Sequence, residues 1–211
     1  MKRRDFAIGL GIAPLLARSA VAAGEPVEGR DFGRLAQAVP VALPGKIEVI
    51  EFFGFWCPHC NELEPKLEAW LRKLPQDVNF RRVPVAWQAA HEPYQRLYFA
   101  LAALGYGEDM NGKVFRAVHG QGLRLEVDAG LSAFAAANGI DKAKLADAMR
   151  GFSVSSKVRM AGQLWDAYHL DSVPTLAVDG RFVTSPERAG GDDQALVVVD
   201  ALVRKARSKA G

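Results

Sequence analysis

Hydrophobic positions in the first half of the chain predict a strand, a helix and a second strand. Residues 45–55, GKIEVIEFFGF, are β-branched and aromatic and almost continuously hydrophobic, as in a strand that is covered on both faces. Between Pro58 and Pro75, leucines and a tryptophan recur at helical spacing. Residues 77–87 then return to a strand-like pattern. Strand, helix and strand in this order predict a parallel βαβ unit.

The second half of the chain is predicted to be mostly helical and to end in a hairpin and a helix. Residues 93–170 are rich in Ala, Leu, Lys and Glu, with hydrophobic positions spaced as in about four or five helices. Residues 175–185 carry an Asp-Gly turn between two strand-like runs, which predicts a β-hairpin. Residues 192–210 read as a closing helix with acids first and bases last. A short edge strand is expected within residues 30–39.

The N-terminus has the pattern of an export leader, residues 1–23. A basic start precedes a hydrophobic stretch at residues 6–17, and Ala20-Val21-Ala22 fits a cleavage site, with cutting after Ala23 as a close variant. An amphipathic helix of the folded protein is the alternative, but the glycines and the proline in this segment argue against it. We expect export through the Sec route. The pair Arg3-Arg4 makes the twin-arginine route the alternative.

Composition and charge exclude several classes of protein. The chain has 211 residues, 49% of them hydrophobic, enough to bury the core of one domain with or without an insertion. Its formal charge of +3 comes from the leader, where four basic residues oppose one acid. The remainder is near neutral, so we expect no nucleic-acid partner. No hydrophobic run reaches the roughly 18–20 residues that a membrane span needs.

The chain has only two cysteines, Cys57 and Cys60, and they are two residues apart. A structural disulfide stabilises mainly by closing a long loop, and this pair would close almost none. A zinc site would need two more ligands. A copper site made of these thiols and His59 stays an alternative, although no methionine partner is obvious. The remaining histidines are scattered singly and read as ordinary surface or helix residues: His91, His119 and His169.

The position of the cysteines favours redox chemistry. Cys57 is expected at the junction of the buried strand and the helix, where free backbone N–H groups and the helix dipole stabilise a thiolate. Pro58 suits the first helical turn, and His59 adds positive charge. Cys60 should lie one turn deeper, so Cys57 is the expected exposed nucleophile and Cys60 the resolving thiol. Because a stabilised thiolate favours the reduced pair, its disulfide is an oxidant.

These residues resemble the DsbA family of periplasmic thiol:disulfide oxidoreductases. The motif Cys57-Pro58-His59-Cys60 matches the family's active site residue for residue, and the strand before it and the helical block after it are similar to the family pattern. The resemblance implies an α/β chain with a thioredoxin fold and an inserted all-helical domain. It places the thioredoxin-like domain at residues 24–87 and 153–211 and the helical insertion at residues 88–152.

The resemblance also implies a substrate-binding loop. Val173-Pro174 is similar to the cis-proline loop of the superfamily, which lies beside the active-site disulfide and exposes backbone groups to an extended substrate. Trp56 and Trp87 are candidates for a hydrophobic surface around the disulfide. Core packing is the alternative for both, and more so for Trp87.

Glu51 is the remaining candidate for the active site. An acid within a buried strand must be satisfied or functional, and Glu51 resembles the buried acid that exchanges a proton with the deeper cysteine. The alternative is a carboxylate that points outward. Arg81 or Arg82 on the next strand is expected to be its partner, where the family often has a lysine, and such a pairing would weaken the relay. Glu48 is expected to face solvent.

The resemblance implies a periplasmic dithiol oxidase that donates the Cys57–Cys60 disulfide to unfolded or newly exported proteins. It implies a membrane-bound, quinone-linked reoxidant of the DsbB kind, and we expect a monomer without metal or organic cofactor. An isomerase or reductase on the same fold is the alternative, but only residues 24–56 precede Cys57, too few for a dimerisation domain. A chaperone-like peptide-binding module is the non-enzymatic alternative.

Overall fold

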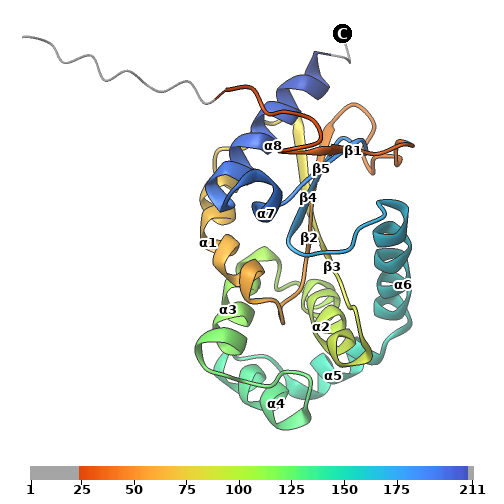
Figure 1. The fold of residues 1–211 in the computed structure, drawn as a ribbon. Helices are drawn as coiled ribbons and strands as arrows, with labels where there is room; N and C mark the ends of the chain where they lie inside the picture. Colours follow the sequence, from red (N-terminus) through yellow and green to blue (C-terminus); the bar gives the residue numbers. More distant parts are fainter. Residues whose placement is uncertain (1–23, 209–211) are drawn as a thin grey trace, which may run out of the picture.

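A computed structural model of the chain describes residues 24–208, which form one mixed β-sheet flanked by helices (Figure 1). The strand order is β1-β5-β4-β2-β3; β2 and β3 are parallel, and the other neighbours are antiparallel. This arrangement confirms the predicted βαβ unit, edge strand and hairpin. The strands are β1 (Gly33–Arg34), β2 (Ile47–Phe53), β3 (Val78–Pro84), β4 (Thr175–Val178) and β5 (Phe182–Thr184).

The helices of the described residues include the long α1 after β2, five helices between β3 and β4, and two after β5. They confirm the helical block and the closing helix. The short α7 and a single π-helical turn, η3 (Arg116–Gly120), were not predicted. The α-helices are α1 (Pro58–Leu71), α2 (Glu92–Ala103), α3 (Asn111–Phe115), α4 (Asp128–Ala137), α5 (Lys142–Arg150), α6 (Phe152–Ala167), α7 (Pro186–Ala189) and α8 (Asp192–Arg207).

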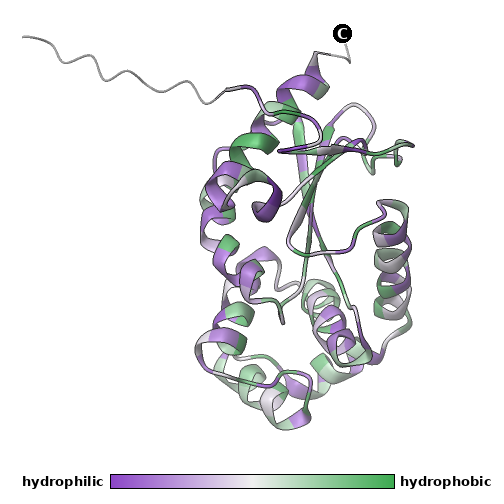
Figure 2. Cartoon of the chain, viewed as in Figure 1, coloured by the Kyte–Doolittle hydropathy of each residue, from purple (hydrophilic) through white to green (hydrophobic). Residues whose placement is uncertain are grey.

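Two hydrophobic cores lie on opposite faces of the sheet. On one face, Leu63 and Leu67 of α1 and the hydrophobic side of α8 pack against the strands. On the other face, Leu97 of α2 and Val154 of α6 join a larger core that extends into the inserted helices. Figure 2 shows mainly hydrophobic strands at the centre and helices that carry both kinds of residue. The sheet is therefore covered on both sides, as the continuous hydrophobic run of β2 predicts.

Full burial of β2 overturns one prediction. Glu48 was expected to face solvent, but its side chain is only 1% exposed. It accepts hydrogen bonds from Nε and Nη2 of Arg81, at 3.0 and 3.2 Å, and from the backbone N–H of Ala42 at 2.9 Å. Strand alternation places Glu48 on the face opposite Glu51, and that face is covered as well. The prediction was wrong because both faces of this strand are buried.

The hairpin between β4 and β5 turns at the predicted Asp-Gly pair. Asp179 and Gly180 both have positive φ, 55° and 63°, as the central residues of a type I′ turn require, and the backbone N–H of Arg181 donates to the carbonyl oxygen of Val178 at 3.0 Å. A Cβ atom on Gly180 would lie 1.9 Å from the carbonyl oxygen of Val39, so the turn also needs glycine for close approach. The turn pairs β5 with β4, and β4 pairs on its other side with β2.

The predicted leader, residues 1–23, lies outside the described residues. Among residues 24–208, no helix has the length and hydrophobicity to cross a membrane.

Candidate active site

Cys57 is the N-cap residue of α1, and Cys60 lies one turn further into the helix. Both are free thiols, so the geometry is that of the dithiol state. Cys60 is completely buried and is the deeper of the two, as predicted, but Cys57 is only 4% exposed. In its protonated form, Cys57 donates from Sγ to the carbonyl oxygen of Val173 at 3.5 Å. The neighbouring loop covers this thiol more than the helix position alone suggests.

The two thiols differ sharply in acidity. The pKa of Cys57 is lowered to about 6, first by a hydrogen bond from the Cys60 thiol, then by the backbone N–H groups of Cys60 and His59 and by the charge of His59. Burial raises the pKa of Cys60 well above its ordinary value, and the neighbouring Cys57 and Glu51 raise it further. Cys57 is therefore the thiolate of the pair, and Cys60 holds the proton.

Pro58 and His59 shape the start of the helix. Pro58 stands at the first helical position, where the missing N–H would have no intrahelical partner. The ring of His59 is 73% exposed, and its Nδ1–H donates to Glu62 at 3.0 Å. This carboxylate raises the pKa of His59 and so favours the imidazolium close to Cys57.

The Val173-Pro174 peptide bond is cis, as predicted, and lies directly beside Cys57. A pocket of about 280 Å³ opens between this loop and the start of α7. Its lining includes His59, Pro174 and the carboxylate-bearing Glu187. The loop thus presents backbone and a small cavity next to the reactive sulfur.

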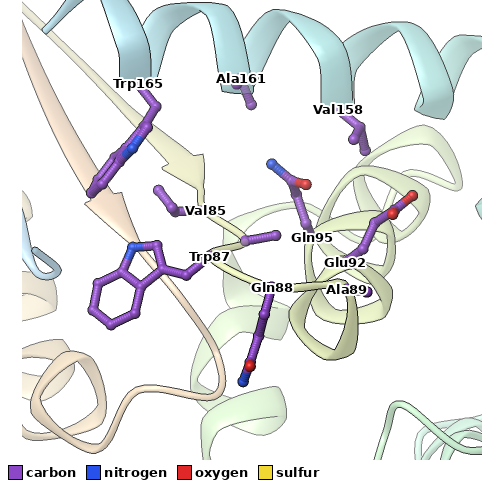
Figure 3. A pocket seen from close by; sticks show the side chains of 11 residues that line it. Val85, Trp87, Gln88, Ala89, Glu92, Gln95, Val158, Ala161 and Trp165 are labelled. Atoms are coloured by element: carbon purple, nitrogen blue, oxygen red, sulfur yellow. The ribbon is translucent and has the colours of Figure 1, made fainter. Parts of the chain in front are cut away.

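Trp56 belongs to an aromatic cluster on the other side of the motif. Its indole N–H donates to the carbonyl oxygen of Val85 at 3.1 Å, its ring stacks on His91 at 3.9 Å, and Trp87 meets it edge-on at 4.6 Å. Trp87 is 50% exposed, so core packing does not describe it. A pocket of about 380 Å³ lies beside Trp87 and reaches Trp165 of α6. Figure 3 shows both side chains in its lining. His91 was read as an ordinary histidine, but it supports this cluster.

Glu51 is fully buried and faces Arg82, its direct neighbour in the register of β2 and β3. Nε of Arg82 donates to Glu51 at 2.9 Å, which identifies Arg82, rather than Arg81, as the expected partner. Burial nevertheless raises the pKa of Glu51, because the loss of hydration outweighs the attraction of Arg82. Arg82 therefore lowers the pKa of Glu51 by less than burial raises it, and the expected weakening of the proton relay by an arginine is outweighed.

Arg82 also binds two acids that the sequence did not single out. Nη2 donates to Glu64 of α1 at 2.9 Å, and Nη1 donates to Glu108. Glu64 follows Cys60 by four residues, so helical spacing places both on the same side of α1 and would have revealed it. Glu108 lies in the short helix η2 (Glu108–Met110), and no pattern in the sequence connects it with the motif.

A second contact from the inserted helices reaches the active-site loop. Nε2 of His119 lies 2.8 Å from the carbonyl oxygen of Phe55, two residues before Cys57. A carbonyl oxygen only accepts, so this nitrogen carries the proton. His119 sits in the π-helical turn η3, and its ring stacks on Phe115. It was read as an ordinary histidine; the structure makes it a support of the loop.

The zinc and copper alternatives concern the same thiols. Within residues 24–208, His, Cys, Asp and Glu side chains do not gather into a group of three or more that could hold a metal ion. The arrangement favours thiol chemistry: an acidic cysteine, a proton-holding partner, a buried carboxylic acid and a cis-proline loop beside the reactive sulfur.

The chain matches two protein families, one described as "DSBA-like thioredoxin domain" over residues 76–198 and one described as "Thioredoxin" over residues 38–94. It is 38% identical over 203 residues to the thiol:disulfide interchange protein DsbA of Burkholderia cepacia, covering 96% of this chain and 95% of the relative. The chain belongs to the DsbA family. DsbA of Bordetella pertussis is similar at 41% identity over 202 residues, covering 95% and 94% of the two chains.

Solved structures agree with this family assignment. The crystal structure of Pseudomonas aeruginosa DsbA has a TM-score of 0.83 and 33% identity, covering 88% of this chain and 96% of the other. The oxidoreductase DsbA from Xylella fastidiosa has a TM-score of 0.80 and 29% identity, covering 87% and 98%. The expected fold, a thioredoxin fold with a helical insertion, is confirmed, and this DsbA-family chain is a thiol:disulfide oxidoreductase.

Proposed function

We propose that this member of the DsbA family works as a dithiol oxidase, giving its Cys57–Cys60 disulfide to substrate proteins. The acidity of Cys57 carries the proposal, because a pKa of about 6 stabilises the reduced pair and makes the disulfide oxidising. DsbA is itself the standard example of an acidic cysteine in a strongly oxidising pair, so this direction agrees with the family and is not independent of it.

The reaction transfers two electrons from a substrate dithiol to the enzyme disulfide. A substrate thiolate attacks Sγ of Cys57; the bond to Cys60 breaks, a mixed disulfide forms, and the leaving Cys60 sulfur takes a proton. A second substrate thiolate then attacks the substrate sulfur of the mixed disulfide, and Cys57 leaves as the thiolate. The acidity of Cys57 favours this last step, because a low-pKa thiol is the better leaving group.

Glu51 is the proposed source of the proton for Cys60. It is fully buried on the strand that leads to the motif, and its raised pKa suits an acid that keeps a proton until a thiolate forms nearby. It takes the proton back when the disulfide closes again.

Val173, Pro174 and Trp56 form the proposed substrate surface. The carbonyl group of Val173 lies at the reactive sulfur, where an extended substrate could pair with backbone groups regardless of its sequence. Trp56 and the half-exposed Trp87 provide hydrophobic contact on the other side of the motif. This combination fits unfolded or newly exported proteins of varied sequence.

We further propose the location and the division of the chain. Residues 1–23 act as a cleaved leader for export to the periplasm, where a membrane-bound, quinone-linked partner of the DsbB kind reoxidises the enzyme. Residues 24–87 and 153–211 form the thioredoxin-like domain, and residues 88–152 form the helical insertion. N-terminal sequencing of the exported chain tests the leader: a first residue at Gly24, or one position earlier, supports it, and an intact Met1 contradicts it.

The oxidase proposal is tested with a reduced two-cysteine peptide and the oxidised protein. We expect rapid peptide oxidation and its complete loss with Cys57→Ser or Cys60→Ser, because neither variant can form the disulfide that accepts the two electrons from the peptide. His169→Gln, a change of an exposed histidine outside the motif, is the matched control. A redox equilibrium with glutathione as reducing as that of thioredoxin would contradict the oxidase. Peptide binding by Cys57→Ser as tight as by the wild type, with no peptide oxidation by either protein, would favour a chaperone-like module.

A further inference from the structure

Arg82 is the centre of a buried ionic cluster that joins the sheet, the active-site helix and the inserted helices. Its side chain is 1% exposed, and its three guanidinium nitrogens each donate to a different acid. Nε binds Glu51 of β2 and Nη2 binds Glu64 of α1, both at 2.9 Å, and Nη1 binds Glu108 of η2. One cation is thus shared among three carboxyl groups from three elements.

The two deeper acids of this cluster are incompletely satisfied. Oε1 of Glu51 and Oε1 of Glu64 are buried without a hydrogen-bond partner among the described residues. An ionised oxygen in such a position loses its hydration without replacement, so a proton on the carboxyl group is favoured. Consistent with this, burial raises the pKa of Glu64 to about 8.

Glu108 differs from these two acids because it reaches water. Its side chain is 57% exposed, and it also accepts hydrogen bonds from the hydroxyl group of Tyr98 at 3.2 Å and from Nδ2 of Asn111 at 2.8 Å. Solvent and neutral donors therefore support its negative charge. Its ion pair with Nη1 of Arg82 offsets part of the positive charge that would otherwise favour the ionised forms of Glu51 and Glu64.

We propose that Glu108 is a positioning residue for disulfide exchange: by binding Arg82 from the inserted helices, it keeps on Glu51 the proton that Cys60 receives. The proposal rests on the proposed relay role of Glu51. The other strand beside Glu51, β4, places Leu176 opposite it. The charged and titratable groups around Glu51 are Arg82 from β3, Cys57, Cys60 and Glu64 from α1 and its N-cap, Tyr98 from α2, and Glu108 from η2.

The first test compares Glu108→Gln with Asp109→Asn in the reduced full chain. Both changes remove one negative charge from neighbouring exposed positions, but within residues 24–208 Arg82 forms its ion pairs with Glu51, Glu64 and Glu108 and not with Asp109. The titration of the Glu51 carboxyl carbon is followed by NMR and assigned by its disappearance in Glu51→Gln. With Glu108→Gln we expect the Glu51 midpoint to fall by about one pH unit, a tenfold change in the acid dissociation constant of Glu51. The negative charge of Glu108 is lost, and the positive charge of Arg82 then acts more strongly on Glu51.

With Asp109→Asn, the Glu51 midpoint should stay at the wild-type value. Equal midpoints in the two variants, or a rise with Glu108→Gln, would overturn the proposal. Thermal unfolding of both variants checks that each is folded, and the conservative, solvent-exposed nature of the changes makes that the expected result.

A second test separates this proposal from the relay role of Glu51. The single-turnover rate of peptide oxidation is measured against pH. If Glu51 gives its proton to Cys60, Glu51→Gln removes the limb of the pH–rate profile that reports the ionisation of Glu51. Glu108→Gln then moves this limb to lower pH by the same amount as the Glu51 midpoint measured by NMR. If Glu51→Gln leaves the rate profile unchanged, the relay fails, and so does the positioning role of Glu108 in exchange. If the relay holds and Glu108→Gln leaves the limb in place, only the role of Glu108 fails.

Discussion

Replacing His59 with glutamine tests how the start of α1 stabilises the Cys57 thiolate. In the wild-type protein the exposed ring of His59 is bonded to Glu62, which raises the pKa of His59 and so favours the positive charge. Glutamine removes this charge. It leaves the larger contributions in place, namely the hydrogen bond from Cys60 and the backbone N–H groups of the first turn.

The structure sets the size of the expected change. The pKa of Cys57 falls from the ordinary 9.0 to about 6. At pH 7 this corresponds to about 90% thiolate, compared with about 1% for an unperturbed thiol. Because water screens the exposed imidazolium, we expect His59→Gln to raise the midpoint by about half to one pH unit. One pH unit of thiolate stabilisation corresponds to about 30 mV, so the variant should be the weaker oxidant by up to that amount.

The sign of the pH dependence follows from the lowered pKa of Cys57. The thiolate preference stabilises the folded, reduced protein fully above the ordinary value of 9.0 and is lost as the pH falls through about 6. Reduced wild-type protein should therefore gain stability between pH 6 and pH 8, and His59→Gln should gain less over the same range.

Absorbance at 240 nm during a pH titration of the reduced protein gives the Cys57 midpoint, and equilibrium with glutathione gives the potential. His169→Gln, which changes an exposed histidine outside the motif, should match the wild type in both. A wild-type midpoint close to 9.0 would refute the thiolate argument altogether. Equal midpoints for the wild type and His59→Gln would show that the imidazolium does not stabilise the Cys57 thiolate. Only the backbone N–H groups and Cys60 would then account for the lowered pKa.

Three further predictions concern buried contacts. Glu51→Gln should slow the opening of the disulfide about 10²-fold by removing the proton source for Cys60, measured by stopped-flow tryptophan fluorescence. His119→Phe should lower the free energy of unfolding by about 1–2 kcal/mol and slow exchange, because the Phe55 carbonyl loses its donor, whereas His119→Gln should restore part of both. Glu48→Gln should lower the free energy of unfolding by about 1.5–3 kcal/mol in urea denaturation while leaving the glutathione equilibrium unchanged.

The sequence was most informative where function depends on local pattern. The strand before Cys57, the helix start at Pro58, the Asp-Gly hairpin and the cis bond before Pro174 follow from hydrophobic period, turn chemistry and resemblance, and the structure agrees. The same approach failed for Glu48, because alternation distinguishes the two faces of a strand but does not tell which face is covered.

Contacts from the inserted helices were out of reach for the sequence. His119 meets a carbonyl group 64 positions earlier in the chain, and Glu108 meets Arg82 across 26 positions. These pairs depend on how the insertion docks against the thioredoxin-like part, which no periodicity encodes. The burial of Cys57 has a different origin, because its cover comes from Val173, 116 positions away, in the loop that the resemblance places beside the motif.

The adjacent arginines of β3 also specify how the two central parallel strands align. Arg81 and Arg82 point to opposite faces of the sheet and meet Glu48 and Glu51, which lie on opposite faces of β2. A slip of one residue would turn each arginine to the wrong face and leave buried charges unpaired on both sides. The ion pairs thus select a single alignment of β2 against β3, and a misaligned pairing would be penalised once the helices cover both faces of the sheet.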